Sequence, residues 1–277
     1  MKPSGNATRP LAVAHLTALE APPVECVRLA AKAGFDGVGL RLHPATPGGI
    51  AYPIVAGSAA QRELRDTLAG VGVALFDVEF IPIVPEFDPR SFESLFEAAA
   101  SLGASSVSVS GDDPDENRLA ANLAALAGIA KSFGLRIDLE FMRWRHVGTL
   151  AHARAAIERA AQPNLALVID ALHLSRSGGT PDDVAAMPSA QIGLMQLCDA
   201  PRALPVCDDD AIREARIARL APGDGALPLE ALLHAAPRNV ALSVEMPMPS
   251  LSADARMKLA WRSARRVVDS ASVAAKV

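Results

Sequence analysis

Four polar side chains stand at the ends of four consecutive apolar runs in the second half of the chain. They are Glu140 in RIDLEF, Asp170 in LVIDAL, Gln196 in LMQLCD and Glu245 in LSVEMP. Short apolar runs bounded by turn residues are typical of buried strands, and parallel strands bring their carboxyl ends to one rim. Three carboxylates and an amide on one rim would repel each other without a cation. Their oxygens suit Mg²⁺ or Mn²⁺ best, with Zn²⁺ or Co²⁺ as alternatives, so the pattern predicts a site for one divalent metal ion.

Each of these residues also has a structural explanation when it is taken alone. Asp170 could cap a helix, and Glu140 could pair with Arg143. Their repetition at successive strand ends is what favours a shared ligand role. Strand side chains alternate between two faces, so Asp138 should point into the same barrel interior as Glu140. A buried aspartate needs a partner there, such as Arg136 or water.

The elements that must position these residues alternate between strand and helix. We expect strands at 11–16, 38–42, 73–81, 106–110, 136–141, 165–170, 192–197 and 240–246. We expect helices at 22–32, 58–70, 92–102, 115–133, 150–161, 181–186, 228–235 and 253–271. This alternation predicts an α/β protein with a single (β/α)8 TIM barrel over residues 1–277, the polar first ten residues being flexible. An open doubly wound sheet is the alternative, but no GxGxxG follows the first strand.

Two stretches are too long for ordinary connections. Residues 42–57 and 198–227 both follow strands and read as irregular loops, which are often active-site covers. Further candidate site residues lie on the same rim. We expect substrate contacts from His173, Arg202, Glu79 and His43. Arg41 and His43 end the second strand and could bind an anionic group. Basic residues nearby, including Arg145 and Arg219, could favour an acidic substrate.

Bulk properties favour a metabolic enzyme over a nucleic-acid or membrane protein. Half of the 277 residues are hydrophobic, the net charge is −4, and only three cysteines occur, in no zinc or redox spacing. No apolar stretch approaches a membrane span or a secretory signal. We therefore expect a cytoplasmic protein that binds a small molecule, with no nucleic-acid or membrane partner. Alanine-rich helix faces would also suit a homodimer.

Three further patterns make a family resemblance specific. AGFDG at 33–37, the series E…DxxH…QxxD…E, and PGDG at 222–225 together resemble the xylose isomerase-like TIM-barrel superfamily, across essentially the whole chain. This superfamily includes sugar isomerases and epimerases such as D-tagatose 3-epimerase. The resemblance implies that Glu140, Asp170, Gln196 and Glu245 hold one divalent metal. It also implies that His173 and Arg202 contact substrate oxygens.

The resemblance leaves several functions open. One is an isomerase or epimerase acting on a small, sugar-like polyhydroxy carbonyl compound through a metal-stabilised enediolate, with Glu140 and Glu245 as acid and base. Gln196 stands where epimerases usually have histidine, and this variant resembles some 3-dehydroshikimate dehydratases, so a lyase is the alternative. A non-catalytic barrel is a second alternative. A relative of endonuclease IV is disfavoured, because the chain has only six histidines and a negative net charge.

Overall fold

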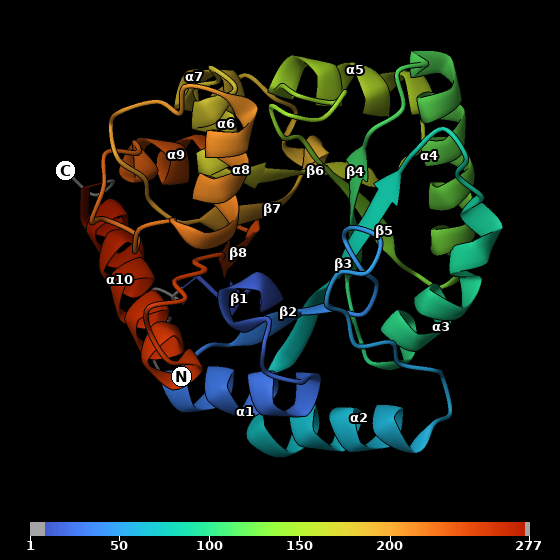
Figure 1. Ribbon diagram of the computed structural model, residues 1–277, viewed down its shortest axis with the longest axis horizontal. Coiled ribbons are helices and arrows are strands. Elements are labelled where there is room, and N and C mark those ends of the chain that lie inside the picture. Colours follow the sequence, from blue (N-terminus) through green and yellow to red (C-terminus); the bar gives the residue numbers. More distant parts are fainter. Residues whose placement is uncertain (1–8, 275–277) are drawn as a thin grey trace, which may run out of the picture.

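The strands close into one parallel barrel of eight. The structure, a computed structural model, describes residues 9–274. Neighbouring strands pair in sequence order, and β8 completes the barrel against β1 (Figure 1). The strands are β1 (Leu11–Val13), β2 (Gly37–Arg41), β3 (Ala74–Ile83), β4 (Ser106–Gly111), β5 (Arg136–Glu140), β6 (Leu165–Asp170), β7 (Ile192–Leu197) and β8 (Ala241–Val244). The predicted (β/α)8 TIM barrel is confirmed. Residues 1–8 of the segment expected to be flexible lie outside the described residues.

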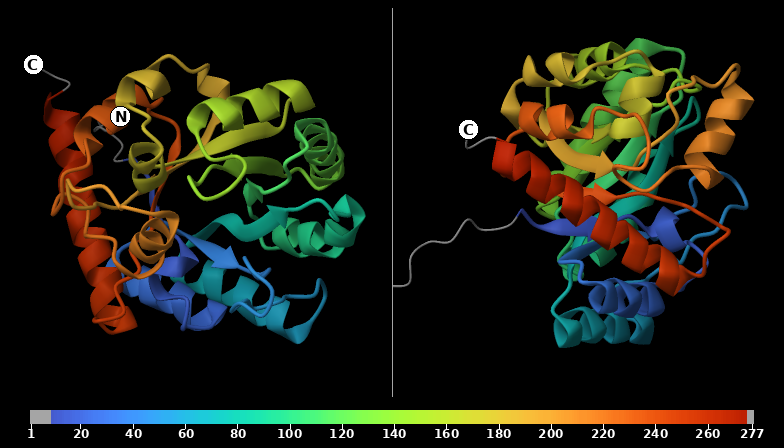
Figure 2. Two further views of the ribbon diagram at one scale, coloured as in Figure 1. Left: turned by 45° about the horizontal axis from the view of Figure 1, so that its top comes forward. Right: turned by 90° about the vertical axis from the view of Figure 1, so that its left-hand side faces the viewer.

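Helices surround the barrel on all sides (Figures 1 and 2). They are α1 (Pro23–Ala33), α2 (Ala59–Val71), α3 (Glu93–Ser101), α4 (Glu116–Ser132), α5 (Leu150–Ala160), α6 (Ala171–Arg176), α7 (Pro181–Ala185), α8 (Asp208–Ile217), α9 (Leu229–Ala235) and α10 (Ala253–Ala274). Short 3₁₀ turns are η1 (His15–Ala18), η2 (Pro89–Phe92) and η3 (Ser189–Gln191). Within residues 9–274, the helices are all too short or too polar to cross a bilayer.

Local sequence signals explain where several helices begin and end. Ser58 caps α2, its side chain accepting a hydrogen bond of 3.1 Å from the backbone of Gln61. Gly34 ends α1 at a φ of 105°, a left-handed conformation that glycine adopts without strain. Both boundaries agree with the capping patterns in the sequence.

Two helices were not expected from the sequence. The 198–227 stretch is not irregular throughout, because α8 occupies its centre. Three aspartates, at 208–210, form the first turn of this helix. Their negative charges interact favourably with the positive end of the helix dipole and stabilise the helix. Helix α6 begins directly after β6 and has only six residues, too few to show a helical period.

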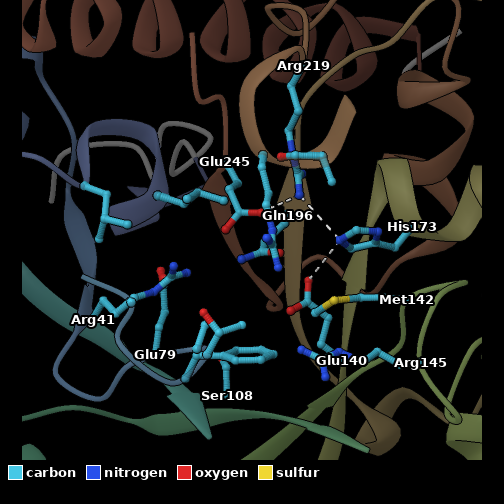
Figure 3. Close-up of a pocket in the computed structure, with 18 of the residues that line it drawn as sticks. Arg41, Glu79, Ser108, Glu140, Met142, Arg145, His173, Gln196, Arg219 and Glu245 are labelled. Atoms are coloured by element: carbon cyan, nitrogen blue, oxygen red, sulfur yellow. Dashed lines mark hydrogen bonds and ion pairs between the residues drawn. The ribbon is translucent and has the colours of Figure 1, made fainter. Parts of the chain in front are cut away.

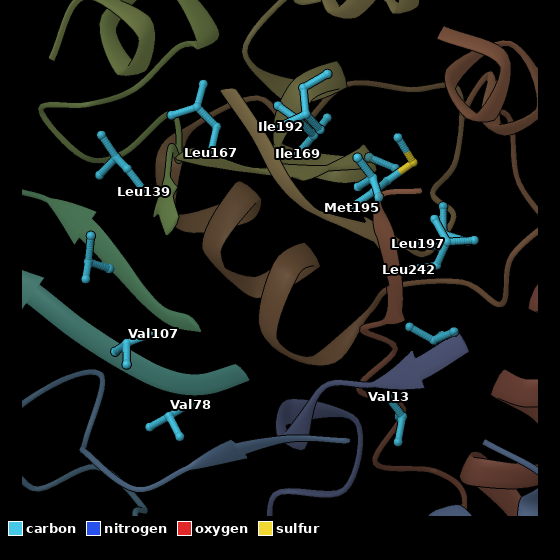
Figure 4. Packing of buried hydrophobic residues seen from close by; sticks show 14 of the residues in the cluster. Val13, Val78, Val107, Leu139, Leu167, Ile169, Ile192, Met195, Leu197 and Leu242 are labelled. Atoms are coloured by element: carbon cyan, nitrogen blue, oxygen red, sulfur yellow. The ribbon is translucent and has the colours of Figure 1, made fainter. Parts of the chain in front are cut away.

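The apolar core lies between the strands and the surrounding helices. Strand residues that alternate with the inward-facing polar ones pack there, including Leu139, Ile169, Met195 and Leu242, all fully buried (Figure 4). Burial of both strand faces is what a parallel barrel requires. The core thus fixes which face of each strand points to the barrel axis, and so aims the polar strand ends at a common space.

Polar residues fill part of the barrel interior below the rim. Asp138 is fully buried and accepts two hydrogen bonds from the Arg136 guanidinium, at 2.6 and 2.8 Å. This pair is the partnership expected from the sequence. The three cysteines are free thiols, again as expected.

Candidate active site

The four predicted ligand residues come together at the carboxyl end of the barrel. Glu140 ends β5, Asp170 ends β6, Gln196 lies next to last in β7, and Glu245 directly follows β8. Asp170 and Gln196 are partners in the β6–β7 register. All four are buried, and a cavity of about 280 Å³ opens above them, lined by Glu140, Gln196 and Glu245 (Figure 3). The barrel geometry therefore places Glu140, Gln196 and Glu245 in one pocket, with Asp170 beside Gln196.

The spacing of three of these side chains fits a bound cation. The end of the Gln196 amide lies 3.1 Å from Glu140 Oε1 and 3.2 Å from Asp170 Oδ2. If the amide nitrogen occupies that end, both contacts are hydrogen bonds. If the amide oxygen occupies it, this oxygen lies close to the separation of about 3.0 Å from each carboxylate oxygen that neighbouring ligands have on an octahedral ion with bonds of about 2.1 Å. Ligand atoms of Glu140, Asp170 and His173 also lie within 4.8 Å of one another, so this part of the site can hold a divalent cation.

Asp170 uses its two carboxylate oxygens for different purposes. Oδ1 caps α6 by accepting hydrogen bonds from the backbone of Leu172 at 2.7 Å and of His173 at 3.0 Å. Oδ2 faces the site and accepts from Arg219 Nη1 at 2.5 Å. Burial opposes ionisation, but the charge of Arg219, together with the hydrogen bonds from Arg219 and from the backbone of His173, outweighs it and lowers the pKa of Asp170. The structural cap and the ligand role are therefore compatible in one residue.

Arg219 connects two of the carboxylates. Its Nη2 lies 2.6 Å from Glu245 Oε2, so the guanidinium bridges Asp170 and Glu245, and its side chain is 1% exposed. Leu220, the next residue in the chain, forms an antiparallel β-bridge with Asp199 through backbone hydrogen bonds of 2.9 and 2.8 Å, and this bridge holds Arg219 in place. Asp199 in turn accepts hydrogen bonds from the backbone of Gly223 and Leu227 in and after PGDG. The QxxD and PGDG motifs therefore position Arg219 together.

Burial changes the ionisation of the remaining acid–base groups. It raises the pKa of Glu245 to about 7, against the opposing Arg219 charge. Burial, with the charges of Glu245 and Asp170, also raises the pKa of Glu140 well above its ordinary value. Burial lowers the pKa of His173 to about 4, so this imidazole is neutral at pH 7. Its Nε2 lies 3.8 Å from Glu140 Oε1 and 3.5 Å from Arg219 Nη2.

The predicted substrate-binding residues are only partly brought to the pocket. His173 and Glu79 line it, while His43 lies behind Phe80, hydrogen-bonded to its carbonyl, and is not among the lining residues. Arg202 is exposed and also does not line the pocket. Substrate contacts by all four of these residues remain predictions.

Two arginines that line the pocket, Arg41 and Arg219, are more central to the site than the sequence indicated. Arg219 was expected only as part of a basic rim, and Arg41, with His43, only as a residue that could bind an anionic group. For Arg41 the signal was its position at the end of β2, whereas the contact of Asp199 with PGDG that positions Arg219 is long-range and has no local signal.

Asp77 is buried next to Ser108, a residue that lines the pocket, and forms no ion pair within residues 9–274. Its Oδ2 accepts a hydrogen bond of 3.1 Å from Ser108, whereas Oδ1 is buried and finds no partner in residues 9–274. A Cβ at Gly39 would lie 2.6 Å from Asp77 Oδ1, so this glycine makes room for the acid. Burial, then the charge of Glu79, raises the pKa of Asp77 well above its ordinary value.

We expect Asp77→Asn to stabilise the protein at pH 8 by about 1 kcal/mol, or roughly 2–4 °C in Tm. The folded state keeps the Asp77 proton above the pH at which the unfolded chain loses it. Stability of the wild type therefore falls as pH rises from about 4 toward the raised pKa, and asparagine removes that loss. Thermal melts of both proteins between pH 4 and 8 measure the effect.

Asp138→Asn is the matched control, because Asp138 is equally buried but paired with Arg136. We expect it to lower Tm, since it breaks a charged pair. Equal effects of the two substitutions would contradict this description of Asp77.

Comparison with known proteins agrees with the fold and with the motifs. Residues 27–270 match the family described as xylose isomerase-like TIM barrel. A 3-dehydroshikimate dehydratase of Pseudomonas aeruginosa is 33% identical over 146 residues, which are 52% of this chain and 22% of that protein. The chain thus matches about a fifth of the length of this curated relative.

Solved structures show the same fold at lower identity. The IolI protein with a binding zinc atom has a TM-score of 0.77 at 20% identity, over 94% of this chain and 98% of its own. D-psicose 3-epimerase from Clostridium cellulolyticum has a TM-score of 0.69 at 15% identity, over 95% and 98%. The family match covers most of the chain, so this protein belongs to the xylose isomerase-like TIM-barrel family.

Proposed function

We propose that the protein is a metal-dependent dehydratase acting on a small cyclic hydroxy ketone that carries a carboxylate, of the 3-dehydroshikimate type. The observation that carries this proposal is the composition of the pocket wall. Above the acidic strand ends, the wall is built mainly from arginines and apolar side chains. Such a wall suits a carbocyclic anion better than a polyhydroxy sugar.

Apart from Glu79, Glu140, His173 and Glu245 and the small residues Ala45, Gly49 and Ala215, the lining residues fall into three groups. The arginines are Arg41, Arg145, Arg216 and Arg219. The larger apolar residues are Leu16, Leu19, Ile50, Phe80, Met142 and Trp144. Among the described lining residues, the side chains with a hydroxyl or amide are Thr46, Ser108 and Gln196. A sugar with hydroxyls on most carbons would leave many of these hydroxyls facing apolar walls, at a cost for each unmatched polar group.

The comparisons support the same substrate class. The curated relative at 33% identity is a 3-dehydroshikimate dehydratase. The Gln196 position, where epimerases of the family usually have histidine, also resembles dehydratases.

Glu140, Asp170, Gln196 and Glu245 would hold the cation. All four offer oxygens, a set that Mg²⁺ and Mn²⁺ prefer, although the IolI structure contains zinc. When bound, the cation would act as a Lewis acid that polarises the substrate carbonyl and so acidifies the neighbouring C–H. The residues around it then have to move protons.

We assign proton removal to Glu245, a carboxylate that lines the pocket directly after β8. It takes the proton from the carbon beside the carbonyl, and the C–H electron pair becomes the new C=C bond. The C–O bond on the next carbon breaks, and the hydroxyl leaves as water after taking a proton. Glu140, which lines the pocket, is the candidate for donating that proton, because the neutral imidazole of His173 is a weak acid.

An epimerase is the second candidate. Glu140 and Glu245 reach the pocket from different strands, so one could remove a proton and the other return it on the opposite face. D-Psicose 3-epimerase shares the fold.

We expect purified protein with Mn²⁺ or Mg²⁺ to convert 3-dehydroshikimate into 3,4-dihydroxybenzoate, followed by the absorbance of the aromatic product. Removal of metal by a chelator should abolish the reaction, and added metal should restore it, because the carbonyl is not polarised without the cation. D-Psicose and D-tagatose, analysed by chromatography under the same conditions, serve as comparison substrates. Epimerised ketose with no aromatic product would overturn the dehydratase in favour of the epimerase.

A further inference from the structure

Arg41 presents unused hydrogen-bond donors to the pocket. It is the last residue of β2, and its backbone nitrogen donates to His15 Nδ1 at 2.9 Å. Its Nη2 donates to Glu79 Oε2 at 2.8 Å. Its Nε is enclosed by protein without a partner, and Nη1 makes no hydrogen bond within residues 9–274. A guanidinium has five N–H donors, so most of those on Arg41 are available to a ligand.

By contrast, each guanidinium nitrogen of Arg219 already has a hydrogen-bond or ion-pair partner in the protein. Its Nε donates to the Ala215 carbonyl at 2.8 Å, and its Nη1 to Asp170. Its Nη2 is paired with Glu245 and lies within reach of His173. Arg219 therefore organises the carboxylates of the site and has little to offer a substrate.

Arg41 is also held rigidly. Glu79, which accepts from it, accepts through its other oxygen a hydrogen bond of 3.0 Å from the backbone nitrogen of His15. The side chains of Arg41 and Glu79 are 11% and 3% exposed. A group fixed on a strand and oriented by its neighbours binds with less loss of entropy than one on a loop.

Arg41 lies across the pocket from Glu140 and His173. Figure 3 shows Arg41 and Glu79 on one side and His173, Glu140 and Arg145 on the other, with Glu245 and Gln196 between them. A substrate whose leaving hydroxyl lies toward Glu140 would thus direct its opposite end past Glu245 to Arg41.

We infer that Arg41 binds the carboxylate of the substrate and so selects anionic over neutral cyclic hydroxy ketones. This inference rests on the proposed function, in which the substrate carries a carboxylate. Carboxylate and guanidinium form charge-assisted hydrogen bonds, which are stronger than bonds between neutral groups.

Arg145 is the competing arginine and provides the matched control. It also lines the pocket, pairs with an aspartate, Asp112, and has an enclosed Nε without a partner in the described chain. It lies in the loop after β5, however, on the side of Glu140, where a bound anion would approach the acidic strand ends.

The test measures binding of 3,4-dihydroxybenzoate and of its methyl ester to Mn²⁺-loaded protein by titration calorimetry. We expect the wild type to bind the acid at least about tenfold more tightly than the ester. Arg41→Met should weaken binding of the acid about 10- to 100-fold, while binding of the ester changes little, so the preference disappears. Arg145→Met should keep the preference.

Arg41→Met leaves Glu79 buried without its partner, so the double variant Arg41→Met/Glu79→Gln removes both charges and should also lose the preference. A preference for the acid that survives in both variants overturns the role of Arg41 while the proposed function stands. A wild type that binds neither compound, and does not dehydrate 3-dehydroshikimate, overturns both.

Discussion

Replacing Glu245 with glutamine is expected to lower the turnover of 3-dehydroshikimate about 10²- to 10⁴-fold and to leave the barrel folded. Glutamine has nearly the same shape, and Arg219 keeps its hydrogen bond to Asp170. What disappears is the carboxylate that takes the proton from the carbon beside the carbonyl. Deuterium uptake from D₂O into substrate recovered at partial conversion should therefore be lost in Glu245→Gln, because that uptake requires proton removal.

Glu214→Gln is the matched control for this substitution. Glu214 also pairs with a buried arginine, Arg176, at 2.7 Å, but it does not line the pocket. Turnover should remain within about threefold of the wild type, because neither Glu214 nor Arg176 lines the pocket. Normal deuterium uptake in Glu245→Gln would show that another group removes the proton.

Arg219→Met is expected to lower the free energy of unfolding of the metal-free protein by about 3–5 kcal/mol. The substitution leaves Asp170 and Glu245 buried without the positive charge that lies 2.5 and 2.6 Å from them. A divalent cation bound by the same carboxylates would replace part of that charge. Added Mn²⁺ should therefore raise the Tm of the variant more than that of the wild type, by roughly 5 °C or more.

Arg176→Met controls for the loss of a buried arginine as such. Arg176 is 3% exposed at its side chain and binds Glu214 with two hydrogen bonds of 2.7 Å, away from the strand ends. We expect this variant to lose stability without any extra response to Mn²⁺. If Mn²⁺ raises the Tm of all three proteins equally, Arg219 and the cation do not share the same carboxylates.

The fold and the four strand ends could be predicted because they depend on local patterns. Each short apolar run predicts a buried strand. Closure of a parallel barrel then brings the carboxyl ends of consecutive strands together, whatever path the connecting loops take. Glu140 and Asp170 therefore lie near each other although 30 positions separate them in the chain. The need of Asp138 for a partner could be predicted in the same way, from a charge on an inward-facing position.

The pairing of Arg219 could not be predicted, because it depends on a long-range contact. Nothing near Arg219 in the sequence indicates that Leu220 pairs with Asp199 and that Asp199 binds the PGDG backbone. Helix α8 was missed for a related reason: it packs Ala211 and Ala215 and otherwise carries mainly charged residues, so its apolar pattern is weak. Arg202 was expected at the pocket from motif spacing alone, and α8 with its preceding loop leaves it exposed.

The central claim is that a single divalent cation is held by oxygens of Glu140, Asp170, Gln196 and Glu245. Anomalous diffraction from a crystal of the protein grown with Mn²⁺ tests it most directly. We predict one anomalous peak at the carboxyl end of the barrel, about 2.1–2.3 Å from an oxygen of each residue, with the Gln196 amide oxygen facing the ion. Density without a peak there, with the Gln196 amide nitrogen donating to Glu140 and Asp170, would contradict it.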